Sequence, residues 1–202
     1  MNEVVEQAVQ GLRSGRPVIL PTDTVYGLAA SPYRREPVDC LYRLKGRSRQ
    51  QPTALVAPDL DMLFECVPEL RGRAGVIARA LLPGPYTLIL PNPARRYPWL
   101  TGTTPYAIGV RVPELPEPAA HVLARVGAVA ATSANFPGGP DPCRLDEVPE
   151  ELRSEAAAVV DGGELPGTPS TVLDFTTAEP RVVREGAVPA EAALARVDAA
   201  LA

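Results

Sequence analysis

Small polar and basic side chains gather in four segments of the chain, and each segment adjoins a short apolar run. The segments lie at residues 20–28, 44–49, 129–135 and 167–172. In the first, Thr22 and Thr24 flank an aspartate and Tyr26 follows. Proteins that alternate helices and strands usually bind ligands where strands end, so these segments are candidates for a ligand site. Taken singly, each is more often a turn or a cap.

The second segment carries three cations around Gly46. One of them, Lys45, is the only lysine among the 20 Lys and Arg residues of the chain. Cations at the end of a helix are favourable against the helix dipole, so a solvated helix cap explains the segment. A polyphosphate clamp, in which Lys45 and Arg47 neutralise a nucleotide, explains it equally. The pattern alone leaves both interpretations open.

Arg111 stands inside the apolar run Ile108-Gly109-Val110-Arg111-Val112. A charge in such a run must point to solvent or be paired, because burying it alone is costly. A carboxylate is one good partner for the planar guanidinium. An exposed strand face is the competing interpretation.

Composition excludes several classes of site. The single histidine, His121, lies in a stretch that favours a helix, so neither a histidine triad nor a histidine metal cluster is predicted. Cys40, Cys66 and Cys143 have no paired spacing, which predicts free thiols and no metal site. There is no apolar run of about 18 residues. We therefore expect a cytoplasmic protein with no membrane contact.

The net charge of −4 and the isoelectric point near 5.2 disfavour a broad basic surface for nucleic acid. A local basic pocket remains compatible with this charge. The chain has 202 residues, 46% of them hydrophobic, which is enough for the core of one domain.

Hydrophobic periodicity predicts the elements that must position these residues. Helices are expected at 4–12, 37–44, 70–82, 116–125 and 190–202, and strands at 18–20, 86–90, 108–112, 126–131, 159–161, 171–175 and 181–184. Alternating helices and short apolar strands indicate an α/β fold, and the closely spaced late strands favour a mixed sheet over a purely parallel one.

Six motifs then occur in one order: PTDTVYGL, KGR, LLPGPYTLIL, GVRVP, ATSAN and PSTV. Together they resemble the YrdC-like domain of threonylcarbamoyl-AMP synthases, from about Gly11 to Gly186. The resemblance implies one YrdC-like domain over residues 1–202, with a twisted mixed sheet, flanking helices and a ligand cavity at strand ends. It also implies the short form of the family, without an extra C-terminal domain.

The resemblance further implies synthesis of threonylcarbamoyl-AMP and pyrophosphate from L-threonine, bicarbonate and ATP, with Mg²⁺. The product would pass to a tRNA threonylcarbamoyl transferase complex for t6A formation, with weak or no direct binding of tRNA. The residues it assigns to threonine are Thr24, Tyr26, Arg111, Ala131 and Ser170. Those it assigns to ATP are Lys45, Arg47, Gln51, Ser133, Asn135 and Arg184, with Lys45 and Arg47 in the catalytic role.

The chain departs from the family pattern at Gln51, Val56, Ala107, Pro137 and Asp141, positions that bear on affinity or substrate choice. Two other functions are therefore considered. One is a related enzyme that adenylates another carboxylate or carbamate. The other is a noncatalytic RNA-binding module, which the acidic charge and the aromatic content of 5% disfavour.

Overall fold

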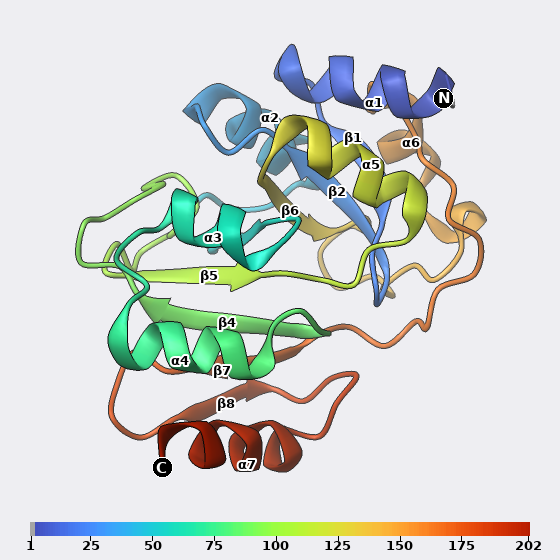
Figure 1. Cartoon of the computed structure of the whole chain (residues 1–202). Helices are drawn as coiled ribbons and strands as arrows, with labels where there is room; N and C mark the ends of the chain where they lie inside the picture. Colours follow the sequence, from blue (N-terminus) through green and yellow to red (C-terminus); the bar gives the residue numbers. More distant parts are fainter. Residues whose placement is uncertain (1–2) are drawn as a thin grey trace.

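A computed structural model describes residues 3–202 as helices around one eight-stranded mixed sheet (Figure 1). The strands are β1 (Val18–Pro21), β2 (Tyr26–Ala30), β3 (Ala54–Val56), β4 (Tyr86–Pro91), β5 (Ala107–Arg111), β6 (Val129–Ser133), β7 (Thr171–Asp174) and β8 (Arg181–Arg184). The helices are α1 (Glu3–Arg13), α2 (Arg35–Lys45), α3 (Leu60–Cys66), α4 (Gly72–Leu81), α5 (Glu117–Val126), α6 (Glu150–Glu155) and α7 (Ala190–Leu201). The predicted α/β class with a mixed sheet is confirmed.

Strand β6 lies in the interior of the sheet, although it comes late in the chain. The strand order is β1-β2-β6-β3-β5-β4-β7-β8. Strand β6 pairs antiparallel with both β2 and β3, while β3 with β5 and β4 with β7 are the parallel pairs. The N-terminal hairpin of β1 and β2 therefore joins the rest of the sheet only through β6.

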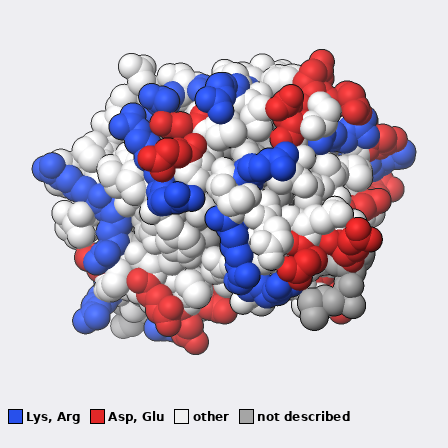
Figure 2. Space-filling model, turned by 90° about the horizontal axis from the view of Figure 1, so that it is seen from above, with Lys and Arg blue, Asp and Glu red and all other residues white. Residues whose placement is uncertain are grey.

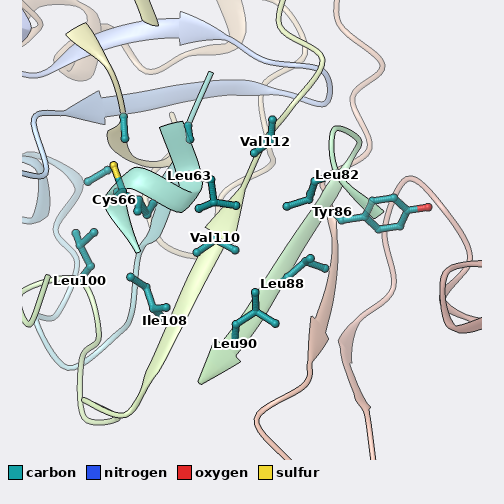
Figure 3. Packing of buried hydrophobic residues seen from close by; sticks show 14 of the residues in the cluster. Leu63, Cys66, Leu82, Tyr86, Leu88, Leu90, Leu100, Ile108, Val110 and Val112 are labelled. Carbon is teal, nitrogen blue, oxygen red and sulfur yellow. The ribbon is translucent and has the colours of Figure 1, made fainter. Parts of the chain in front are cut away.

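One face of the sheet is covered by helices along β4 and β5. Leu88 and Leu90 of β4 and Ile108 and Val110 of β5 are fully buried and pack in one cluster with Leu63 of α3 (Figure 3). Successive residues of a strand point to opposite faces. The residues between these aliphatic side chains therefore face the other side of the sheet.

That second face is only partly covered. Helices α1 and α5 pack on it in a separate apolar cluster, which includes Leu20 of β1, Val56 of β3 and Val129 of β6. Beyond this cluster the same face carries small and polar residues of β3, β4, β5 and β6. The part of the face that α1 and α5 leave uncovered holds a cavity.

The element predictions missed two interior strands and two short helices. Strands β2 and β3 and helices α3 and α6 were not predicted. The strand expected at 159–161 is instead one bridge between Val159 and Ile19. The strand expected from residue 126 begins at Val129, because Gly127, with φ of 78°, ends α5. Within residues 3–202 no helix is both long and apolar enough to cross a membrane.

Candidate ligand-binding site

A cavity of about 330 Å³ occupies the uncovered part of the sheet face. Its wall includes seven residues that the sequence singled out: Thr24, Arg47, Arg111, Ala131, Ser133, Ser170 and Arg184. Arg111, Ser133 and Arg184 are each the last residue of a strand, and Ser170 directly precedes β7. Segments up to 160 residues apart in the chain thus meet at one set of strand ends.

The floor of the cavity is hollow because three neighbouring strands have almost no side chain there. Ala54 of β3 pairs with Ala131 of β6, and Gly109 of β5 pairs with Ile89 of β4. A Cβ added to Gly109 would lie 3.8–3.9 Å from atoms of Ala54 and Thr87, which is ordinary van der Waals contact. The backbone therefore does not require glycine here. The lack of a side chain at Gly109 makes the cavity deeper.

Arg111 is held in the wall by a buried ion pair. Its Nη2 donates to Asp23 Oδ1 at 2.8 Å and to Thr24 Oγ1 at 3.2 Å, while its Nε is buried without a partner. Burial lowers the pKa of Arg111 and raises that of Asp23. A buried donor with no partner is costly, and no described residue offsets this cost at Nε.

Arg184 and Ser170 form a second polar group in the wall. Nη2 of Arg184 donates to the Ser170 carbonyl oxygen at 2.7 Å, and the Ser170 hydroxyl lies 2.8 Å from Thr87 Oγ1. Sequence reasoning missed Thr87. A signal was available, because Thr87 is a polar residue in a mostly apolar strand. Its neighbour Leu88 points into the core, so Thr87 must face the other side of the sheet.

Arg47 enters the wall because the chain turns sharply after α2. Gly46 has φ of 65°, a left-handed conformation that favours glycine. Arg47 Nη1 then donates to Thr132 Oγ1 at 3.3 Å and Nη2 to the Pro52 carbonyl oxygen at 2.6 Å. Its Nε, like that of Arg111, is buried without a partner.

Lys45 lies behind the wall, 3% exposed. Its Nζ donates to the Ser133 carbonyl oxygen at 2.6 Å, the Asn135 carbonyl oxygen at 2.8 Å and Asn135 Oδ1 at 2.7 Å. Three protons thus meet three oxygens at the end of β6. Burial, together with the charge of Arg47, lowers the pKa of Lys45 to about 8, and the charge of Asp141 opposes this shift. Lys45 and Asn135 shape the wall that Ser133 lines.

Two of the predicted site residues lie away from the cavity. Tyr26 belongs to β2, which was not predicted, and its side chain packs in the cluster on the opposite sheet face. Its hydroxyl donates to the Gly163 carbonyl oxygen at 2.7 Å, and burial raises its pKa to about 12. Gln51 is exposed, and its carbonyl oxygen accepts from the Tyr42 hydroxyl at 2.9 Å. Neither residue is among those that line the cavity, and their assignment to a ligand stays a prediction.

The residues that depart from the family pattern also fall into two groups, those that line the cavity and those that do not. Ala107 and Asp141 line the cavity. Val56 instead packs beneath α1 and α5. Pro137 is exposed.

Comparisons with known proteins find relatives over nearly the whole chain. The Sua5_yciO_yrdC family model, which carries the description "Telomere recombination", matches residues 10–186. A Mycobacterium tuberculosis protein is 32% identical over 199 residues, which cover 97% of this chain and 91% of the relative. The threonylcarbamoyl-AMP synthase of Pseudomonas syringae is 33% identical over 188 residues, covering 90% of this chain and 97% of its own length.

A solved structure is similar as well. Sua5 of Pyrococcus abyssi complexed with L-threonine superposes with a TM-score of 0.86 at 31% identity, over 96% of this chain. The matched region spans 56% of that archaeal chain. Sequence and fold therefore agree over nearly the whole length, and the chain belongs to the Sua5/YciO/YrdC family.

Proposed function

We propose that the protein is an L-threonylcarbamoyladenylate synthase, which forms threonylcarbamoyl-AMP and pyrophosphate from L-threonine, bicarbonate and ATP. Relatives of about 32% identity carry the name threonylcarbamoyl-AMP synthase, and one similar structure holds L-threonine. The observation that carries the proposal is the shared cavity. Arg47, Arg111 and Arg184 all line it, so three guanidinium groups meet in one cavity.

Threonine is assigned to the part of the cavity around Arg111. The guanidinium receives the α-carboxylate through the donors that Asp23 and Thr24 leave free, since arginine binds carboxylates through two parallel hydrogen bonds. Thr24, Ser170 and the backbone of Ala131 supply short polar contacts for the rest of the amino acid. The small floor at Gly109 leaves room for its side chain.

The phosphates of ATP are assigned to Arg47, Ser133 and Arg184, which line the same cavity. The amino nitrogen of threonine attacks bicarbonate with loss of water, and an oxygen of the resulting carbamate attacks the α-phosphorus. The bond from the α-phosphorus to the bridging oxygen breaks, and pyrophosphate leaves with that electron pair. Such a step needs positioning and charge stabilisation more than covalent participation by side chains.

Lys45 supports the phosphate site indirectly, through the residues that its ammonium holds. Its ammonium fixes the carbonyl oxygens of Ser133 and Asn135, so it sets the position from which the Ser133 hydroxyl reaches the nucleotide. We assign Asn135 the same supporting role, because its amide nitrogen donates to the Gly139 carbonyl oxygen at 2.8 Å.

The partners follow from the chemistry of the product. A mixed anhydride of a carbamate and a phosphate is reactive toward water, so direct transfer to a tRNA threonylcarbamoyl transferase complex is the proposed fate. Mg²⁺ is the proposed companion of ATP, since it neutralises phosphate charge during transfer.

The test is mass spectrometric detection of the adenylate after incubation with ATP, Mg²⁺, L-threonine and ¹³C-bicarbonate. The expected product carries one ¹³C and disappears when threonine or bicarbonate is omitted. A panel of other amino acids and of simple carboxylates tests the related-enzyme alternative. Pyrophosphate release that needs no bicarbonate would contradict the proposal.

A further inference from the structure

Asp141 is the only carboxylate in the cavity wall among the described residues. It lies on the loop that follows β6, six residues after Asn135. The Asn135 amide nitrogen donates to Asp141 Oδ1 at 3.3 Å. No described residue donates a hydrogen bond to Oδ2.

A carboxylate at this place conflicts with an anionic nucleotide. The other charged residues of the wall are Arg47, Arg111 and Arg184, which suit phosphate. Two negative groups within a few ångströms repel each other by several kcal/mol at most in a partly buried site. The ammonium of Lys45 is near enough to feel this charge, but it donates to oxygens of Ser133 and Asn135 and not to Asp141. A nucleotide that approaches Asp141 therefore needs a further cation between them.

We propose, on the basis of the proposed function, that Asp141 Oδ2 is a ligand of the divalent cation that arrives with ATP. Mg²⁺ is commonly held by one or two carboxylates together with phosphate oxygens and water, and a single carboxylate oxygen without a protein partner meets that need. The metal then bridges Asp141 and the nucleotide, and the repulsion becomes an attraction. Since one carboxylate is a weak site alone, metal and nucleotide bind together.

The experiment measures binding of α,β-methylene-ATP, which cannot release pyrophosphate, by calorimetry in Mg²⁺ and in EDTA. Wild type is expected to bind at least about five-fold more tightly with Mg²⁺, a typical coupling between two ligands. Asp141→Asn keeps an acceptor for Asn135 but loses the charge. It is expected to bind the Mg²⁺ complex about five-fold more weakly, and the metal-free analogue more tightly, than wild type.

A matched control separates local charge from net charge. Asp146 is exposed, pairs with Arg144 and does not line the cavity. Asp146→Asn removes the same charge and is expected to leave both affinities unchanged. As a second readout, Mn²⁺ bound with the analogue should give an electron paramagnetic resonance signal that Asp141→Asn weakens.

Weaker binding of the analogue by Asp141→Asn in Mg²⁺, together with tighter binding in EDTA, would identify Asp141 as a metal ligand. A change in the same direction under both conditions, or no change, would overturn the inference while leaving nucleotide binding by wild type intact. Wild type that fails to bind the analogue under either condition would overturn the proposed function together with this inference.

Discussion

At the scale of single residues, the two sides of the KGR motif act differently. Gly46 turns the chain so that Arg47 enters the cavity wall while Lys45 reaches behind it. The Lys45 ammonium meets three oxygens at 2.6–2.8 Å, a geometry that suits a compact cation with three protons. A guanidinium is planar and longer, and it cannot satisfy the same three acceptors from the same backbone position.

Lys45→Arg is therefore expected to lower turnover by about ten-fold or more, and Lys45→Ala by about a hundred-fold or more. Steady-state pyrophosphate release measures this, with thermal melts as the check on folding. An unimpaired Lys45→Arg enzyme would mean that only a positive charge is needed there.

The same lysine predicts a dependence on pH. Its pKa falls from 10.5 to about 8, so the ammonium is present at pH 7 and the neutral amine forms as pH rises through about 8. The neutral amine loses the charge and one of the protons that hold Ser133 and Asn135. Affinity for α,β-methylene-ATP, measured by calorimetry from pH 7 to 9.5, is expected to fall above pH 8. Asp146→Asn, which is remote from Lys45, should keep the same profile, and a flat profile in wild type would contradict the role.

Arg111→Ala is expected to weaken threonine binding by about 1.5–3 kcal/mol, and ATP binding by much less, because a hydrogen-bonded charge on the carboxylate is lost. Arg111→Lys keeps the charge without the planar fork and should recover only part of the affinity. Calorimetric titration with each substrate decides between the assignments. Equal losses for threonine and ATP would place Arg111 elsewhere in the reaction.

At the scale of the elements, alternation along the strands divides the sheet into a packed face and a ligand face. Aliphatic residues of β4 and β5 at 88, 90, 108 and 110 fill the core, and the residues between them form the cavity. Most strands could be predicted because each contains a short apolar run. Strand β2 could not, since its run follows the hydroxyl-rich turn at 22–24. Without β2, the sequence could not show that Tyr26 packs on the face opposite the cavity.

Gly109→Val tests the ligand face. The backbone at residue 109 does not require glycine, and a strand favours valine over glycine. The melting temperature of the variant is therefore expected to equal or exceed that of wild type. The added side chain fills the floor between Ala54 and Thr87, and the KM for threonine is expected to rise at least about ten-fold, the usual effect of a misfit of one or two methyl groups.

The control for this variant lies one residue earlier on the opposite face. Ile108→Val removes one methylene from the core and is expected to cost about 0.5–1.5 kcal/mol of stability. The KM for threonine should not change. If both variants changed the stability but left the KM for threonine unchanged, the cavity would not be the threonine site.

At the scale of the whole molecule, charge does not favour a large nucleic-acid surface. The net charge is −4, and on the face in Figure 2 acidic and basic side chains are interspersed. The positive side chains that matter for ligands lie inside the cavity. The net charge follows from composition alone, which needs no knowledge of the fold. It could not predict that Lys45 stands behind the wall, because that depends on contacts 88 and 90 residues away in the chain.

Purified protein is expected to bind bare tRNA more weakly than about 1 µM at physiological salt, within the range of nonspecific electrostatic binding. Fluorescence anisotropy across a series of salt concentrations measures both the affinity and its slope. A submicromolar affinity that falls steeply with salt would favour the RNA-binding alternative.

The interior position of β6 has a consequence for synthesis on the ribosome. Until residues 129–133 emerge, β2 and β3 each present one unpaired edge, because β6 is the neighbour that both require. Open edges invite pairing with other chains, and domains assemble from the N-terminal side as they are made. Between the emergence of β5 and that of β6, the nascent chain thus carries two separate pieces of the sheet, β1-β2 and β3-β5-β4. Arrival of β6 seals both edges and delivers Ser133 to the cavity wall, so a chain able to bind ligand has already passed its period of greatest aggregation risk.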